Sequence, residues 1–84
     1  RALDFITADE GWAAADFALY RTLDGGATWT VVPAVGISAG TFFLDVEFVD
    51  DMHGWVITTP DEDTWEPLEV YRTTDGGASW NLLP

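Results

Sequence analysis

Short runs of apolar, aromatic and β-branched residues alternate along this chain with clusters of Asp, Gly, Ser and Pro. Runs of this kind predict β-strands, and the clusters between them predict turns. We expect four strands in each half of the chain, near 3–7, 12–15, 17–22 and 28–32, and again near 43–49, 54–59, 68–73 and 79–83.

The segment from Trp12 to Ala15 contains three alanines, which favour a helix by propensity. Turn residues flank it, however, and its counterpart from Trp55 to Thr59 is rich in β-branched residues. We therefore predict a strand at both places.

A ten-residue stretch occurs twice, at 20–29 and at 71–80. The copies share Tyr, Arg, Thr, Asp, Gly, Gly, Ala and Trp in the same order, and Ser79 stands in the place of Thr28. Asp-Gly-Gly predicts a tight turn, because the carboxylate accepts backbone N–H groups and glycine adopts positive φ without strain. We expect the Trp that follows to pack beneath its hairpin, with its indole N–H bonded to a partner.

The repeated pattern Thr/Ser-x-Asp-x-Gly-x-Thr/Ser-Trp resembles the Asp-box, or BNR, repeat of sialidase-type and sortilin-type β-propellers. The residues that carry the structural Asp-box pattern are Thr22, Asp24, Gly26, Thr28 and Trp29 in the first copy and Thr73, Asp75, Gly77, Ser79 and Trp80 in the second. Upstream, 5–12 and 46–55 each place Phe, several polar residues and Gly-Trp before a strand, which resembles the repeat of the photosystem II assembly factor-like propellers. The resemblance implies an all-β fold of two consecutive four-stranded antiparallel propeller blades.

The repeat also predicts how the chain is divided. We expect blade one at 1–34, an inter-blade crossing segment at 35–42 and blade two at 43–84. Gly54 follows Gly11 by 43 residues, whereas Tyr71 follows Tyr20 by 51. Blade two therefore carries an insertion at about 60–67, between its second and third strands.

Blades of a propeller are covered by neighbours on both faces, so two blades alone would expose apolar surface. We expect further blades of the same parent chain or a homo-oligomer to provide the cover. The chain opens at Arg1 directly on strand-like sequence, without a signal peptide, as a processed or excised fragment would.

Charge narrows the range of partners. Fifteen acidic residues against three Lys and Arg give a formal net charge of −12. This excludes a phosphate-neutralising surface for nucleic acid and disfavours an anionic membrane. A solvated acidic surface is the simple interpretation, and a cationic partner is the alternative. The chain has no cysteine, and no apolar run approaches the roughly 20 residues of a membrane span, so we expect no membrane insertion.

In a four-stranded meander, the first and third turns lie at one rim, and the second turn and the inter-blade connection lie at the other. Length variation falls at the second rim, which makes it the candidate functional face. Its insertion places Trp65 among Asp61, Asp63 and Glu66, an arrangement that could stack on a sugar or anchor a protein partner. The alternative is an acidic loop whose Trp folds back onto its own blade.

Sialidases and glycosidases use the same repeat, so an enzyme has to be considered. Glycoside hydrolysis needs two carboxylates roughly 5–10 Å apart, which a chain this acidic provides by chance. A sialidase-like site also needs clustered arginines, whereas Arg21 and Arg72 occupy equivalent positions one blade apart, where nearby acids could pair with them. We therefore predict no catalytic residues. His53 stands alone and the acidic runs lack the spacing of a known metal loop, so we predict no metal and no cofactor.

These observations favour a non-catalytic β-propeller segment that serves as a protein-binding or assembly scaffold. The alternative is part of a secreted carbohydrate-active propeller, either a glycoside hydrolase or a glycan-binding protein, whose partner would be a glycan. The family resemblance favours an extracytoplasmic or secreted location.

Overall fold

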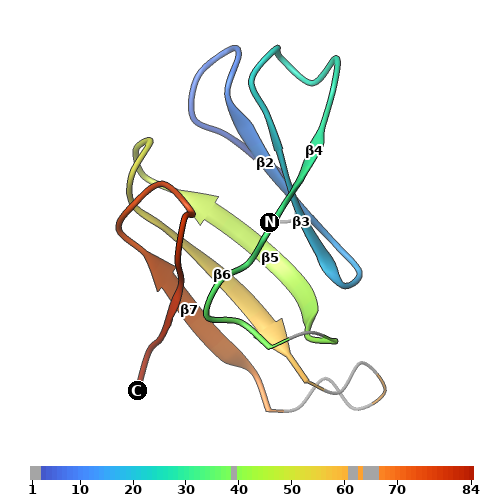
Figure 1. Ribbon diagram of the computed structural model, residues 1–84, viewed down its shortest axis with the longest axis vertical. Coiled ribbons are helices and arrows are strands. Elements are labelled where there is room, and N and C mark those ends of the chain that lie inside the picture. The colour runs from blue at the N-terminus through green and yellow to red at the C-terminus, as the bar shows by residue number, and fades with distance from the viewer. Residues whose placement is uncertain (1–2, 39, 61–62, 64–66) are drawn as a thin grey trace.

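The structure is a computed structural model that describes residues 3–38, 40–60, 63 and 67–84. This part of the chain forms eight strands and no helix: β1 (Leu3–Phe5), β2 (Gly11–Ala15), β3 (Ala18–Thr22), β4 (Thr30–Val32), β5 (Phe42–Phe48), β6 (Gly54–Thr59), β7 (Glu69–Thr73) and β8 (Asn81–Leu82). They make two four-stranded antiparallel meanders, β1-β2-β3-β4 and β5-β6-β7-β8 (Figure 1). The predicted all-β fold of two consecutive propeller blades is confirmed, and the two sheets are called blade one and blade two below.

Several strands are shorter than the sequence pattern predicts. The first ends at Phe5 because Thr7 already belongs to the turn, where its hydroxyl accepts hydrogen bonds from the backbone N–H groups of Asp9 and Glu10. The fourth begins at Thr30, because the N–H of Thr28 is bonded to the Asp24 carboxylate and not to β3. Turn chemistry therefore takes residues that propensity alone assigns to strands.

The two blades repeat the same strand register. Trp12 pairs with Arg21 in blade one, and Trp55 pairs with Arg72 in blade two. In both blades the turn between the first two strands also bonds the turn between the last two. The N–H of Gly25 donates to the carbonyl of Asp9 at 2.9 Å, and that of Gly76 donates to Met52 at 3.0 Å. The first and third turns of each blade thus share one rim, as the meander predicts.

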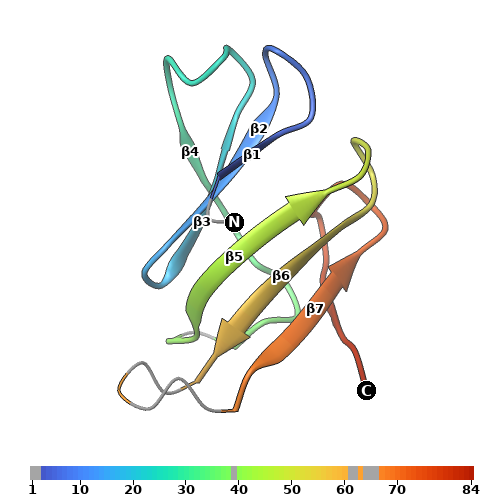
Figure 2. The same cartoon turned by 180° about the vertical axis from the view of Figure 1, so that it is seen from behind.

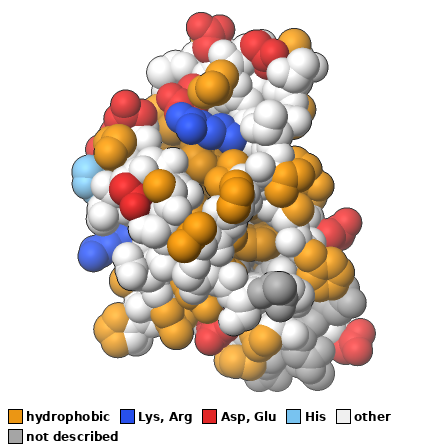
Figure 3. All heavy atoms as spheres, viewed as in Figure 1, with side chains coloured by type: hydrophobic (Ala, Val, Ile, Leu, Met, Phe, Trp, Pro, Cys, Tyr) orange, Lys and Arg blue, Asp and Glu red, His pale blue; other side chains and the backbone are white. Residues whose placement is uncertain are grey.

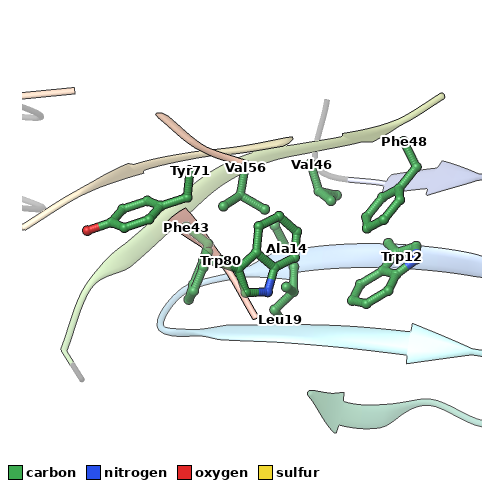
Figure 4. Packing of buried hydrophobic residues seen from close by; sticks show 9 residues of the cluster. All are labelled: Trp12, Ala14, Leu19, Phe43, Val46, Phe48, Val56, Tyr71 and Trp80. Carbon is green, nitrogen blue, oxygen red and sulfur yellow. The ribbon is translucent and has the colours of Figure 1, made fainter. Parts of the chain in front are cut away.

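One face of each blade is buried against the other blade (Figure 2). The apolar core between them contains Trp12, Ala14 and Leu19 from blade one and Phe43, Val46, Phe48, Val56, Tyr71 and Trp80 from blade two (Figure 4). Buried hydroxyls complete the inner face of blade two, since Thr58 and Thr73 are 0 % exposed. The core is therefore an interface between two sheets, which neither blade could form alone.

The outward faces of the two blades are open and partly apolar. On blade one, Leu3 is 48 % exposed, Phe5 40 % and Trp29 36 %. On blade two, Trp55, Ile57 and Val70 are only half-buried. The expectation that two blades alone expose apolar faces is confirmed. Among the described residues no helix is long and apolar enough to cross a membrane.

Candidate functional site

Each Asp-Gly-Gly turn is held by its own aspartate. In the first turn the Thr22 hydroxyl donates to Asp24 at 2.8 Å, and the N–H and hydroxyl of Thr28 donate to the same carboxylate at 2.9 and 2.5 Å. Thr22 also accepts a bond of 2.9 Å from the N–H of Gly26. These four bonds bring the ends of the turn together.

The second turn repeats the first almost bond for bond. Asp75 accepts from the hydroxyl of Thr73 at 2.7 Å, and from the N–H and hydroxyl of Ser79 at 3.0 and 2.6 Å. Gly77 donates its N–H to Thr73 at 2.9 Å. The replacement of Thr28 by Ser79 keeps the hydroxyl and therefore keeps the network.

Hydrogen bonding lowers the pKa of both carboxyl groups. The pKa of Asp24 falls to about 2, because Thr28 donates from its hydroxyl and its N–H and Thr22 adds a third bond. The pKa of Asp75 also falls to about 2, through the hydroxyls of Ser79 and Thr73 and the N–H of Ser79. A carboxylate stabilised in this way is a poor proton donor near neutral pH. Each carboxylate accepts its hydrogen bonds from residues of its own turn.

The two tryptophans that end the repeats differ in burial. Trp80 is 2 % exposed, whereas Trp29 is 36 % exposed and meets Phe5 edge-on at 6.0 Å. Both rings pack inward, but to different depths. Trp80 is covered by blade one, whereas Trp29 lies against its own hairpin, 3.7 Å from the place of a Cβ on Gly26, and no described residue covers it in the same way. The expected bond of the indole N–H is also missing for Trp80, whose Nε1 is buried without a hydrogen-bond partner among the described residues.

A groove of about 380 Å³ lies between blade one and the second Asp-Gly-Gly turn. Its walls are Pro33 and Val35 on one side and the backbone of Gly76 and Gly77 on the other, with Trp12 among the lining residues. The crossing segment is fixed across the groove, since the carbonyl of Val35 accepts a bond of 2.8 Å from the N–H of Trp80. This bond joins the two sides of the groove at the contact between the blades.

Arg21 supplies the positive charge of the groove (Figure 3 shows a basic side chain among hydrophobic ones at the junction of the two blades). Its Nη2 donates to the Glu10 carboxylate, and its guanidinium carbon lies 5.5 Å from the centre of the Trp12 ring. Its Nε is buried without a hydrogen-bond partner among the described residues. The expectation that a nearby acid pairs with Arg21 is confirmed, and the aromatic contact adds a cation–π interaction.

Arg72 has the same register position in blade two but a different environment. The residue that corresponds to Glu10 is His53, whose Nδ1 contacts Asp50 at 2.9 Å. Asp50 also accepts the N–H groups of Met52 and His53, and these bonds together with the His53 ring lower its pKa. Arg72 itself is exposed. The two arginines therefore do not converge on one site, as the sequence analysis expects.

The predicted binding loop lies largely beyond what the structure describes. Asp63 is exposed, whereas Asp61, Trp65 and Glu66 lie outside the described residues. The groove beside Arg21 was not predicted. The hairpin register of the repeat places Trp12 directly across from Arg21, which signals the contact of these two lining residues but not the part that blade two contributes. Within the described ranges no group of three or more His, Cys, Asp or Glu side chains is placed to hold a metal ion.

The sheets and the groove define a class of protein, an all-β chain built from consecutive propeller blades. No protein-family model matches the chain. No curated protein matches it either. Among solved structures it is similar to YCF48 bound to D1 peptide, with 32 % sequence identity and a TM-score of 0.75. The match covers 98 % of this chain and 25 % of that one, so the chain spans about a quarter of the length of its structural neighbour.

Proposed function

We propose that this chain is a non-catalytic propeller segment that binds a peptide segment of a protein partner and serves as an assembly scaffold. The observation that carries the proposal is the likeness to YCF48, which extends over 98 % of this chain, in a structure in which YCF48 is bound to a D1 peptide. The two Asp-Gly-Gly turns act as BNR-type Asp-box repeats, which stiffen the rim and leave the grooves between blades to bind.

The groove beside Arg21 has the chemistry that an extended peptide needs. Pro33 and Val35 offer an apolar wall for one side chain, and the glycine backbone opposite leaves room for the peptide main chain. Arg21 uses Nη2 on Glu10, and its side chain is 35 % exposed, so the guanidinium still offers N–H donors to a peptide carbonyl. Apolar burial supplies affinity and the guanidinium fixes orientation.

The charge of the chain selects the peptide. With a formal net charge of −12, the surface repels acidic ligands, and Glu10 already neutralises Arg21. A peptide with an apolar anchor and basic flanks therefore suits this surface better than an acidic one. Trp65 and the acids of the 60–67 insertion form a second contact at the opposite rim in this proposal. The carbohydrate-active alternative gains no support from the structural neighbour.

The test is a library of short fluorescein-labelled peptides, screened by fluorescence anisotropy and varied in net charge and in the position of one apolar residue. Binding should favour basic peptides, and Arg21→Gln should weaken it about tenfold, as expected for loss of a directed hydrogen bond to a charged group. Arg72→Gln removes the equivalent cation of blade two and should leave the affinity unchanged.

Trp65→Ala tests the second rim with the same peptides. Peptide binding that survives Arg21→Gln and is lost in Trp65→Ala would move the site to the insertion. Measured hydrolysis in a panel of fluorogenic glycosides, without binding of any peptide, would overturn the scaffold and favour the carbohydrate-active alternative.

A further inference from the structure

The contact between the two blades follows a simple rule, in which the second-strand Trp of one blade enters the turn of the next. The Trp12 ring stacks on Phe48 with centroids 4.6 Å apart and meets Trp80 edge-on at 6.3 Å. A Cβ added to Gly77 would lie 2.4 Å from Trp12, so only glycine leaves space for the indole. The Asp4 carboxylate bridges the blades by accepting a bond of 2.7 Å from the N–H of Phe48.

The open face of blade two has residues of similar chemistry in the positions that make this contact in blade one. Trp55, Ile57 and Val70 stand where Trp12, Ala14 and Leu19 stand, because both blades share one strand register. Glu47 takes the position of Asp4. We call this surface the Trp55 face. It is hollowed, since a groove of about 130 Å³ is lined by Trp55, Ile57 and Val70 together with Glu47.

The open face of blade one has the residues that receive such a contact. Leu3 and Phe5 stand where Val46 and Phe48 stand, and Gly26 and Trp29 stand where Gly77 and Trp80 stand. We call this surface the Phe5 face. Gly26 has φ +96°, and a Cβ there would meet Trp29 and Phe5 no closer than 3.7 Å. The space beside Gly26 that corresponds to the one Trp12 fills beside Gly77 is therefore unoccupied by any described residue.

We propose that the Trp55 face binds the Phe5 face of a second copy of this chain, head to tail. Trp55 of one copy then stacks on the second copy's ring at position 5 and lies over its glycine at position 26. Glu47 reaches the N–H at position 5, as Asp4 reaches Phe48 within one chain. The new interface thus continues the contact that already joins blade one to blade two.

A head-to-tail contact fits these surfaces better than two like faces in contact. Two Trp55 faces would set indole against indole and bring Glu47 toward a second Glu47, with no glycine to receive either ring. Heterologous contacts of this kind form rings when the rotation closes.

The net charge opposes the assembly and makes its strength depend on the salt concentration. Each copy carries a formal net charge of −12, so copies repel one another at low ionic strength. Added salt screens this repulsion and leaves apolar burial intact. Association should therefore become stronger as the salt concentration rises, which is the opposite of an assembly held by ion pairs.

The test is sedimentation velocity on the chain and on two matched variants. Trp55→Glu disables one face and Leu3→Glu disables the other, so each variant alone should be a monomer. Mixed together they should form a one-to-one dimer and nothing larger, because each supplies the face that the other has lost. Leu23→Glu adds the same charge at a side chain that is 66 % exposed on the first Asp-Gly-Gly turn and should associate like the parent.

Circular dichroism shows whether each variant retains its sheets, and Trp55→Ala and Leu3→Ala replace the glutamates if one does not. A parent that stays monomeric at high salt and high concentration would overturn the proposal. Failure of two folded variants to form the mixed dimer would overturn it as well. So would association abolished by Trp55→Glu but untouched by Leu3→Glu, since that result describes two like faces in contact. Peptide binding at the Arg21 groove is measured separately and does not depend on the outcome.

Discussion

The indole of Trp12 in blade one and the ring of Phe48 in blade two are stacked, with centroids 4.6 Å apart and planes inclined by 13°. Trp80 meets Phe48 edge-on at 6.1 Å and closes the cluster (Figure 4). Trp12, Phe48 and Trp80 are all less than 10 % exposed. Because the cluster spans both sheets, the stability of each blade depends on the other.

Phe48→Ala should therefore destabilise the chain severely. The change removes a buried ring and leaves a cavity against Trp12, a loss of about 3–5 kcal/mol in the free energy of unfolding. A chain of this size has little stability in reserve, so part of the population should be unfolded at room temperature. Urea denaturation followed by circular dichroism in dilute solution measures the loss.

The matched control is Phe5→Ala, which truncates the same residue type at the same register position of blade one. Phe5 is 40 % exposed, so its truncation should cost well under half as much as that of Phe48. Equal losses in the two variants would contradict the assignment of the core to the contact between the blades.

Gly77→Ala should destabilise the chain more than an alanine at another glycine of similar backbone conformation. The φ angles of Gly77 and Gly40 are +89° and +83°, so both substitutions carry the cost of a left-handed alanine, about 1–2 kcal/mol. The new methyl at position 77 would also lie 2.4 Å from Trp12, whereas a methyl at position 40 would have no neighbouring atom within 4 Å. Overpacking should add about 1–3 kcal/mol at position 77 alone. Thermal unfolding of both variants measures the difference, and equal melting temperatures would contradict it.

The strands and their connections could be predicted because the residues that set them act locally. The apolar runs and the Asp-Gly-Gly turns determine which segments form strands and which strands pair, while hydrogen bonds in the turns shorten the ends of β1 and β4. Because the sequence repeats, the strand positions of blade one then predict those of blade two. These are properties of short segments, and the structure reproduces them with the same register in both blades.

Burial could not be predicted in the same way. Trp29 and Trp80 follow nearly identical stretches, yet one is 36 % exposed and the other 2 %. The difference depends on which face the neighbouring blade covers, and no local pattern records that. The groove at Arg21 escaped prediction for the same reason, because it is formed by segments from both blades.

Asp4 is another residue whose role depends on the neighbouring blade, and its removal should be costly. It is 5 % exposed, and its carboxylate accepts the N–H of Phe48 at 2.7 Å across the two blades. Asp4→Ala leaves that buried N–H without its partner, which should cost about 1–3 kcal/mol. Glu47→Ala, at the equivalent and exposed position of blade two, should change the free energy of unfolding by less than about 0.5 kcal/mol. Urea denaturation of the two variants separates them, and a larger effect at Glu47 than at Asp4 would contradict the bridging role.

Acid should weaken the two Asp-Gly-Gly turns within a defined range of pH. The folded chain holds the pKa of Asp24 and of Asp75 at about 2, below the ordinary value of 3.8. A carboxyl group whose pKa is lower in the folded state stabilises the fold above its ordinary pKa, and this contribution is lost as pH falls through the folded value. The contribution is therefore complete at neutral pH and disappears between about pH 4 and pH 2.

The double variant Asp24→Asn/Asp75→Asn isolates this contribution from the titration of the other acids. It should be less stable than the parent at pH 7, and the two unfolding curves should converge as the pH falls to about 2 and the parent carboxylates become protonated. Ser79→Ala removes the donor that lowers the pKa of Asp75 most, so its stability gap should narrow over the same range. Thermal unfolding at a series of pH values measures both gaps. A gap that stays constant down to pH 2 would show that the aspartates act through packing and not through the charge that their hydrogen bonds stabilise.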